Sequence, residues 1–208
     1  MNVFLRADSS LSIGSGHIIR CLNLAKVLEK AGARCSFISK DHTGNILDKI
    51  KQEGFPVEVI PVADKSNTYI SDEKSWLNGS QCDDAEKFID LIVENCFNPD
   101  IIIVDHYSLD YEWEAIVKAR FPDSHLVVID DLCNRPHCCD LLIDQTYMRS
   151  AREYAQFNKR EGKVLAGAKY ALLNPAFSQL RKQSIVRKAN ITAPKKLLLT
   201  MGGVDAHN

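Results

Sequence analysis

Short apolar runs alternate with longer amphipathic stretches along this 208-residue chain, and that alternation limits the folds that it can adopt. Several runs are apolar at every position, so both of their faces must be covered, as in the central strands of a parallel sheet. The amphipathic stretches supply the helices that cover such a sheet. The sequence therefore predicts an α/β fold, a Rossmann-like parallel sheet with helices on both faces. Strands are expected at residues 2–6, 34–39, 56–60, 101–105, 126–130, 141–144 and 196–201.

The clearest helix is predicted between the first two strands, where apolar residues recur at helical spacing. Its apolar face is expected to include Ile19 and Val27, with Arg20 outside that face. Gly32 follows the last periodic residue, and a glycine at that place commonly ends a helix.

Two further helices are predicted from the same spacing. One spans about residues 83–96, with Asp83 or Asp84 as its N-terminal cap. The other spans about residues 110–121 and places Trp113 on its apolar side, so this tryptophan is expected in the core.

The composition shifts near residue 190, where a basic segment ends in a proline and precedes a new apolar run with a glycine pair. This shift predicts one domain over residues 1–190. Residues 191–208 are then expected to be a linker followed by the first strand and glycine loop, Gly202 and Gly203, of a truncated second domain.

The charge balance argues against a nucleic-acid partner, because 26 basic and 27 acidic residues leave a net charge of −1. No apolar run approaches the roughly 20 residues that cross a bilayer. The first ten residues also lack the plan of a signal peptide. We therefore expect a cytoplasmic protein with no membrane partner, and the sequence assigns no oligomeric state.

The only cluster of cysteines lies in "CNRPHCCD", with Cys133, His137, Cys138 and Cys139. Adjacent cysteines seldom bind one ion, and the chain has no second CxxC pair, so the spacing is poor for zinc. We favour reduced, buried thiols and predict no metal site, with a zinc site as the alternative.

Polar side chains follow several of the predicted strands at their carboxyl ends, where open parallel sheets bind their ligands. The candidates for one shared crevice are Arg6, Asp8, Asp105, His106, Tyr107, Asp130, Asp131, Asp144 and Gln145. The alternative for each acid alone is an ordinary role in a turn or cap.

The first of these loops contains Gly14 and Gly16 directly before His17 and the first predicted helix. Such a turn offers backbone N–H groups and the positive end of a helix dipole to a phosphate or another anion. Ile19 stands where the dinucleotide fingerprint needs a third glycine, and no GK[ST] follows. The dipole favours a neutral imidazole at His17, which suits a general base. The alternative is that His17 only caps the helix or contacts an anion.

A carboxylate is expected to orient this base, and Asp8, at the other end of the loop, is the predicted partner of His17. Two aromatic residues are further candidates for the site. Trp76 lies in the polar stretch 62–80, predicted to be a long loop, and Tyr107 lies at a strand end. Either ring can stack on a sugar or line an acetamido pocket.

Several segments together resemble one family, the sugar-nucleotide hydrolases of the pseudaminic acid pathway. The similar segments, in chain order, are "RADSSLSIGSGHIIRCLNLAKVL", "IVDHYSLDYEWE", "VVIDDLCNRPHCCDLLIDQ", "AGAKYALLNPAF" and "MGGVDAHN". Members of that family resemble two-domain GT-B glycosyltransferases, in which the N-terminal half supplies most sugar-side groups and the C-terminal half holds UDP.

The resemblance implies hydrolysis without a metal or cofactor: water attacks the anomeric carbon of a UDP-sugar, with His17 as the base, and UDP leaves. The implied product feeds a nine-carbon acid that decorates flagella or surface glycans. Because the second domain is expected to be truncated, the chain alone should be poorly active.

The resemblance also carries site residues across. Its first motif contains Arg6, Asp8, Gly14, Gly16, His17 and Arg20, the second contains Asp105, His106 and Tyr107, the third contains Asp130 and Asp131, and Gly202 and Gly203 would hold the nucleotide. Thr146 and Asn174 depart from the family's pattern. Two alternatives stay open: a glycosyltransferase of the GT-B class, disfavoured because no basic, apolar helix for a membrane acceptor is recognised, and a non-catalytic sugar-nucleotide-binding module.

Overall fold

A computed structural model describes residues 1–62, 70–95, 98–189, 193 and 196–199. Seven strands form one sheet in the order β3-β2-β1-β4-β5-β6-β7, and every neighbouring pair is parallel. The predicted Rossmann-like α/β fold is therefore confirmed. The strands are β1 (Asn2–Ala7), β2 (Arg34–Lys40), β3 (Val57–Ile60), β4 (Ile101–Asp105), β5 (His125–Ile129), β6 (Leu141–Asp144) and β7 (Lys163–Ala166).

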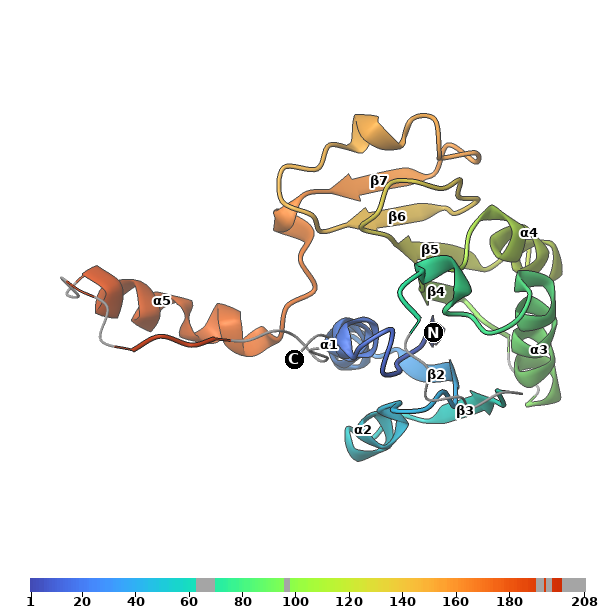
Figure 1. The fold of residues 1–208 in the computed structure, drawn as a ribbon, viewed down its shortest axis with the longest axis horizontal. Helices are drawn as coiled ribbons and strands as arrows, with labels where there is room; N and C mark the ends of the chain where they lie inside the picture. Colours follow the sequence, from blue (N-terminus) through green and yellow to red (C-terminus); the bar gives the residue numbers. More distant parts are fainter. Residues whose placement is uncertain (63–69, 96–97, 190–192, 194–195, 200–208) are drawn as a thin grey trace.

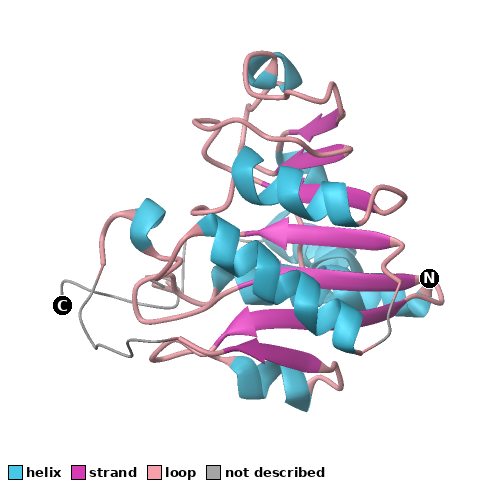
Figure 2. Cartoon of the chain, turned by 90° about the vertical axis from the view of Figure 1, so that its right-hand side faces the viewer, coloured by secondary structure: helices cyan, strands magenta, loops and turns pink. Residues whose placement is uncertain are grey.

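Helices cover both faces of the sheet (Figure 1 and Figure 2). On one face lie α1 (Gly16–Lys30) and α2 (Leu47–Gln52), and on the other lie α3 (Gln81–Glu94) and α4 (Tyr111–Arg120). Each face has its own apolar core. Three short 3-10 helices are found at Glu73–Ser75, Ala151–Tyr154 and Ala168–Tyr170.

Alternation along β1 assigns its side chains to these two cores. Val3 and Leu5 pack in the core beneath α1, whereas Phe4 packs in the core beneath α3 and α4. Burying one such side chain contributes about 1.5–3 kcal/mol, so the apolar residues fix which way the strand faces. The alternation continues through the polar residues near the end of the strand. It therefore decides which of these side chains lie on the same face of the sheet and reach a common site.

The first helix confirms its predicted end and corrects its predicted face. Gly32 has φ +90°, a backbone conformation that side chains rarely adopt, and α1 ends just before it. Cys21 is buried instead of Ile19 and Val27, which are 40% and 50% exposed. The side chain of Arg20, predicted to lie outside the apolar face, is only 11% exposed and reaches Asp105 at the end of β4.

The next two helices are confirmed near their predicted bounds, with a different cap on α3. The side chain of Ser80 accepts a hydrogen bond from the backbone N–H of Asp83 and so caps α3. Asp84 is almost fully buried and serves another role, described below. Trp113 on α4 is fully buried, as predicted.

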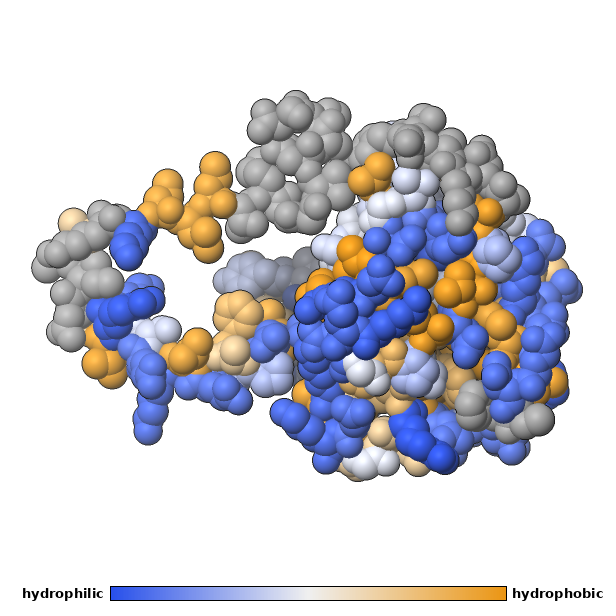
Figure 3. All heavy atoms as spheres, turned by 90° about the horizontal axis from the view of Figure 1, so that it is seen from below, coloured by the Kyte–Doolittle hydropathy of each residue, from blue (hydrophilic) through white to orange (hydrophobic). Residues whose placement is uncertain are grey.

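Besides the 3-10 helices, one described strand and two described α-helices have no counterpart in the prediction. Both β7 and α2 are short, so their patterns are weak. The third, α5 (Pro175–Ala189), has no buried residue, carries Arg181, Lys182, Arg187 and Lys188, and extends away from the sheet (Figure 1 and Figure 3). The helix α5 also exposes Phe177 and Leu180, so basic and apolar side chains do occur together on one helix. That no helix suits a membrane acceptor stays a prediction.

The predicted seventh strand at 196–201 is not found in its described part, because residues 196–199 form no strand. Gly202 and Gly203 lie outside the described residues, as do Cys96 and the predicted domain boundary at 190 and 191. Within the described ranges, no helix has both the length and the apolar character needed to span a membrane.

Candidate functional site

The candidate site lies at the carboxyl ends of β1 and β4, the neighbouring strands from which the chain order runs in opposite directions. Open parallel sheets bind ligands at such a switch point, because the loops diverge there. A pocket of about 730 Å³ opens at this place. We call it the switch-point pocket, and its lining includes Gly16, His17, Ile19, Arg20, Asn23, Trp76, Tyr107, Gln145, Leu173, Asn174 and Phe177.

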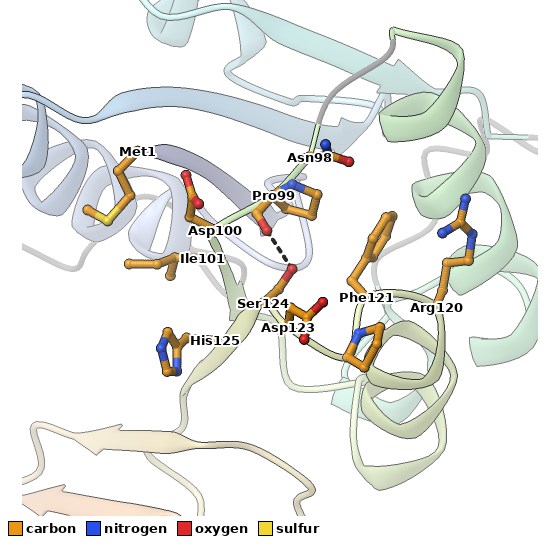
Figure 4. A pocket seen from close by; sticks show the side chains of 11 residues that line it. Met1, Asn98, Pro99, Asp100, Ile101, Arg120, Phe121, Asp123, Ser124 and His125 are labelled. Carbon is orange, nitrogen blue, oxygen red and sulfur yellow. Dashed lines mark hydrogen bonds between the residues drawn. The ribbon is translucent and has the colours of Figure 1, made fainter.

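A larger pocket of about 910 Å³ lies at the opposite edge of the sheet (Figure 4). Its walls come from the segments before β4 and β5, and the hydroxyl of Ser124 there donates to the carbonyl of Pro99 at 2.6 Å. Asp100 accepts the backbone N–H of Asn2 and so ties two strands together. None of the predicted site residues lines this pocket, so the switch-point pocket is the better candidate.

The imidazole of His17 is held from behind by a carboxylate. His17 Nδ1 lies 2.6 Å from Asp105 Oδ1, and the His17 side chain is 7% exposed. Burial alone would raise the pKa of Asp105, but His17 and Arg20 outweigh it and hold that pKa well below its ordinary value. An ionised carboxylate only accepts hydrogen bonds, so Nδ1 carries a hydrogen, and in the neutral ring Nε2 presents its lone pair.

The second nitrogen of His17 is available to a ligand. Among the described residues, Nε2 of His17 makes no hydrogen bond. The buried side-chain nitrogens without a partner belong to His42, His106 and His137, so Nε2 of His17 is not enclosed in the same way. His17 also lines the switch-point pocket. The ring thus has one nitrogen anchored in the protein and the other open to the pocket, as a general base requires.

Arg20 joins the carboxylate of Asp105 to the next strand end. Its Nε and Nη2 each lie 2.5 Å from an oxygen of Asp105, and its Nη1 donates to Asp131. This bidentate contact compensates the buried charge of Asp105. The predicted substrate contact of Arg20 is limited by these bonds, because most of its donors are already used.

The predicted pairing of Asp8 with His17 is wrong. The Asp8 carboxylate is fully buried and accepts from Arg6 Nη1 at 2.5 Å, Arg6 Nη2 at 2.9 Å and the backbone N–H of Lys40 at 2.7 Å. The reason is strand alternation: position 8 continues the even-numbered side of β1, which faces α3, whereas α1 lies on the odd-numbered side. Asp105, paired with Ala7 in the sheet, faces α1.

Arg6 and His106 lie behind the pocket, contrary to the prediction that they contact a substrate. Arg6 is fully buried, and its Nε and Nη2 bind Asp84 at 3.0 and 2.8 Å in addition to Asp8. His106 is 2% exposed, and its Nδ1 accepts the backbone N–H of Ser108. Both belong to the side of the sheet covered by α3 and α4.

Alternation also separates the adjacent acids after β5. Asp130 is buried on the α4 side, where it accepts from Arg135 Nη1 at 2.6 Å and from the backbone N–H of Cys133 at 2.9 Å. Asp131 faces the α1 side, where Arg20 and the hydroxyl of Tyr107, at 3.1 Å, donate to it. Only Asp131 of the predicted pair therefore belongs to the site.

Two aromatic rings form a wall of the switch-point pocket. The rings of Tyr107 and His17 meet edge to face, with centroids 4.6 Å apart. The ring of Trp76 stacks on that of Tyr107, with centroids 6.0 Å apart. The indole N–H of Trp76 donates to the carbonyl of Ile70 at 2.8 Å. Burial raises the pKa of Tyr107. Both aromatic residues, which the sequence named as candidates for the site, line the switch-point pocket.

The glycine turn provides an open helix end. Gly14 has φ +76°, so the turn needs a residue without a side chain at that position. A Cβ at Gly16 would meet nothing within 4 Å, and Ser15 makes no side-chain cap hydrogen bond to α1. The first backbone N–H groups of α1 therefore face the pocket without a side chain covering them, which suits an anion.

Two amides hold one wall of the pocket: Gln145, which the sequence named as a candidate for the crevice, and Asn23, which it missed. Asn23 Nδ2 donates to the carbonyl of Leu172 at 3.2 Å, and Gln145 Oε1 accepts the N–H of Leu172 at 3.0 Å. Gln145 has an odd number at the end of β6, as Asp105 and Asp131 have at the ends of β4 and β5. Strand alternation therefore indicated that all three side chains lie on the α1 side. Asn174, which departs from the family's pattern, caps α5 by accepting the N–H of Ala176.

The cysteine-rich segment has partners of its own. His137 Nδ1 lies 2.7 Å from Glu114 Oε1, both side chains are fully buried, and the N–H of Cys138 donates to the same carboxylate. Cys139 is buried, and burial raises its pKa. The described residues contain no group of three or more His, Cys, Asp or Glu side chains arranged for a metal ion.

Comparisons with known proteins agree with the resemblance drawn from the motifs. No protein-family model matches the chain. It is 28% identical, over its whole length, to the UDP-2,4-diacetamido-2,4,6-trideoxy-beta-L-altropyranose hydrolase of Campylobacter jejuni. The resemblance is thereby confirmed. The chain spans 62% of the length of that relative and 38% of an uncharacterized protein of Methanocaldococcus jannaschii, to which it is 22% identical.

One solved structure is a distant neighbour. MurG of Acinetobacter baumannii matches with a TM-score of 0.48 and 12% identity, over 79% of this chain and 44% of that protein.

Proposed function

We propose that this chain carries the sugar-side groups of a hydrolase that cleaves UDP from a UDP-linked 2,4-diacetamido-2,4,6-trideoxyhexose. Two observations support the proposal. The Campylobacter jejuni relative is named as a hydrolase of such a UDP-sugar. In addition, His17 has one nitrogen bound to Asp105 and the other open to a pocket at the switch point. The second observation carries the proposal, because it gives the chain a base where a ligand would lie.

The proposed reaction is attack of water on the anomeric carbon. Nε2 of His17 takes a proton from the water as the new C–O bond forms, and the bond from the anomeric carbon to the UDP oxygen breaks. UDP departs with the electron pair of that bond. Asp105 stabilises the imidazolium that forms, because its carboxylate accepts the hydrogen bond of Nδ1.

The open end of α1 would assist departure of the leaving group. Its uncapped N–H groups and helix dipole favour negative charge beside Gly16. Arg20 is the only lysine or arginine that lines the described part of the pocket, and Asp105 and Asp131 already engage it. A diphosphate therefore needs further donors. Gly202 and Gly203, which lie outside the described residues, stay the predicted nucleotide contacts.

The deciding experiment follows the UDP-linked diacetamido sugar by NMR in the presence of this chain and of full-length relatives, with no acceptor added. Release of the free sugar and UDP supports hydrolysis. Turnover that requires an added lipid or protein acceptor supports the glycosyltransferase, and binding without any product supports the non-catalytic module.

The matched variants are His17→Ala and His125→Ala. Loss of a general base is typically worth about 10²–10⁴-fold, so His17→Ala should slow sugar release by that factor. His125 is exposed at the opposite edge of the sheet, so its replacement should leave the rate unchanged. Near-native turnover by His17→Ala would remove this histidine from the mechanism.

A further inference from the structure

A cluster of ionisable side chains is buried directly behind the switch-point pocket. We call it the buried charge cluster, and it consists of Arg6, Asp8, Lys40, His42, Asp84 and His106, each no more than 7% exposed. Two cations and two carboxylates balance in it when both histidines are neutral. Burying charges costs several kcal/mol per ion before pairing, and apolar residues would often fill such a space at a lower cost. We therefore consider a role for this cluster other than stabilising the fold.

Asp8 stands at the centre of the cluster and contacts several strand ends. Besides Arg6, its Oδ1 accepts the backbone N–H of Lys40 at the end of β2. Its Oδ2 faces Nε2 of His106 at 3.2 Å and Nε2 of His42 at 3.5 Å. Neither histidine nitrogen is in hydrogen-bond geometry, so these two attractions are electrostatic. Asp8 thus draws the residues after β2 and β4 toward the end of β1.

His106 connects this cluster to the turn that carries Tyr107. Its Nδ1 accepts the backbone N–H of Ser108 at 3.1 Å, which leaves the hydrogen on Nε2, toward Asp8. Its carbonyl accepts from Leu109 N at 3.1 Å and from Arg135 Nη2 at 3.4 Å. The side chain and backbone of His106 together fix the start of the turn.

The contact between Asp8 and His106 lies where the loops after β1 and β4 begin. Ala7 and Asp105 are paired at the last register position of β1 and β4, so Asp8 and His106 are the first residues beyond the sheet. From there one loop leads to His17 and the other to Tyr107, and the two rings meet at 4.6 Å. The gap between the loops is therefore set at the Asp8–His106 contact.

Burial favours a neutral His106. Burial lowers its pKa, and Arg6 on β1 and His17 on α1 lower it further, whereas Asp8 acts in the opposite direction. Lys40 at the end of β2, His42 after it and Asp84 from α3 complete the cluster around His106. A neutral ring can accept from Ser108 at Nδ1 and keep its hydrogen on Nε2, the atom that lies 3.2 Å from Asp8 Oδ2.

We propose that His106 is a positioning residue: it holds the Tyr107 turn against the loop of His17 through Asp8 and so sets the orientation of the His17 ring. The kinetic consequence rests on the proposed function. The ring orientation does not, and it can be measured without a substrate.

Two isosteric variants separate the two contacts of His106. His106→Gln places an amide N–H near the position of Nε2, so it keeps a donor toward Asp8 and gives up the acceptor for Ser108. His106→Asn places a carbonyl near the position of Nδ1, so it keeps the acceptor for Ser108 and does not reach Asp8. The readout is the NMR signal of the His17 ring protons, which the nearby Tyr107 ring shifts. Tyr107→Leu gives the reference for complete loss of that shift.

We expect His106→Asn to move the His17 signal toward its position in Tyr107→Leu. In His106→Gln we expect the His17 signal to stay near its position in the unmodified protein. In kinetics with the UDP-sugar, His106→Asn should lower kcat by about 10²-fold, the size expected for a displaced catalytic group, with KM within about twofold. Asp8→Asn, which removes the charge that attracts His106, is the second variant if His106→Asn does not fold. It should move the His17 signal in the same direction.

Unchanged His17 signals in both His106→Asn and Asp8→Asn overturn the proposal, as does an equal displacement in His106→Gln and His106→Asn. If the signals move as expected while the unmodified protein releases no sugar, the positioning role stands and the proposed function fails. Normal sugar release by a folded His106→Asn variant with a displaced His17 signal overturns the kinetic part.

Discussion

At the scale of single residues, the side on which a residue leaves its strand decides whether it joins the site. Asp105, Asp131 and Gln145 share the odd-numbered side that faces α1, and they bind His17, Arg20 and the wall segment at Leu172. The even-numbered residues leave their strands on the opposite side and bind one another. Adjacent acids such as Asp130 and Asp131 therefore have different roles, although their sequence context is the same.

At the same scale, we predict that Asp105→Asn strongly lowers kcat. An asparagine keeps the shape of the side chain but can no longer stabilise an imidazolium at His17. By analogy with the triads, where such a change costs about 10⁴-fold, we expect a large loss of kcat with little change in KM. Steady-state kinetics of folded protein, checked by circular dichroism, measures this. A variant with normal kcat would mean that Asp105 serves only the fold.

At the scale of elements, the turn between β1 and α1 joins a strained glycine to an open helix end. Gly14 has φ +76°, whereas Gly16 begins α1 with free space around the position of a Cβ. These two glycines were both assigned to ligand binding from the sequence. The structure distinguishes them, because only Gly16 lines the switch-point pocket.

Alanine substitutions should separate the two glycines. Gly14→Ala forces a side chain into a left-handed backbone, so we expect a loss of about 1–2 kcal/mol in the free energy of unfolding. Gly16→Ala removes freedom from the unfolded chain at a compatible position, so we expect unchanged stability or a gain of about 0.4–1 kcal/mol. Urea unfolding followed by circular dichroism compares them. Equal losses in both variants would contradict the assignment of strain to Gly14.

At the scale of the whole molecule, the two faces of the sheet carry different polar chemistry. The α1 face holds the candidate site, and the α3 and α4 face holds the buried charge cluster, whose ion pairs connect β1 to β2 and α3. This cluster links segments distant in the chain, so its loss should affect global unfolding more than local structure.

From the buried charge cluster we predict how the free energy of unfolding falls at acid pH. Burial alone would raise the pKa of Asp8, but the guanidinium of Arg6 outweighs it and holds that pKa well below its ordinary range. The unfolded state then binds more protons than the folded state below about pH 4, the ordinary pKa of an aspartate. The stabilisation is therefore present above that pH and is lost as the pH falls further. Asp8→Asn should be less stable at pH 7 and should lose less on acidification, as measured by urea midpoints from pH 7 to 3. Parallel curves for the two proteins would exclude this role of Asp8.

The sequence by itself determined six strands of the sheet, the helices α1, α3 and α4 that cover it, and the position of His17 at the start of the first helix. These follow from local periodicity and from glycine chemistry, which act over a few residues. Only the tertiary structure decided which carboxylate meets His17. That choice depends on β1 lying beside β4 and on which face of each strand α1 covers, and both are set by long-range burial of apolar side chains. Proximity in the chain favoured Asp8, whereas the register of the sheet brought Asp105.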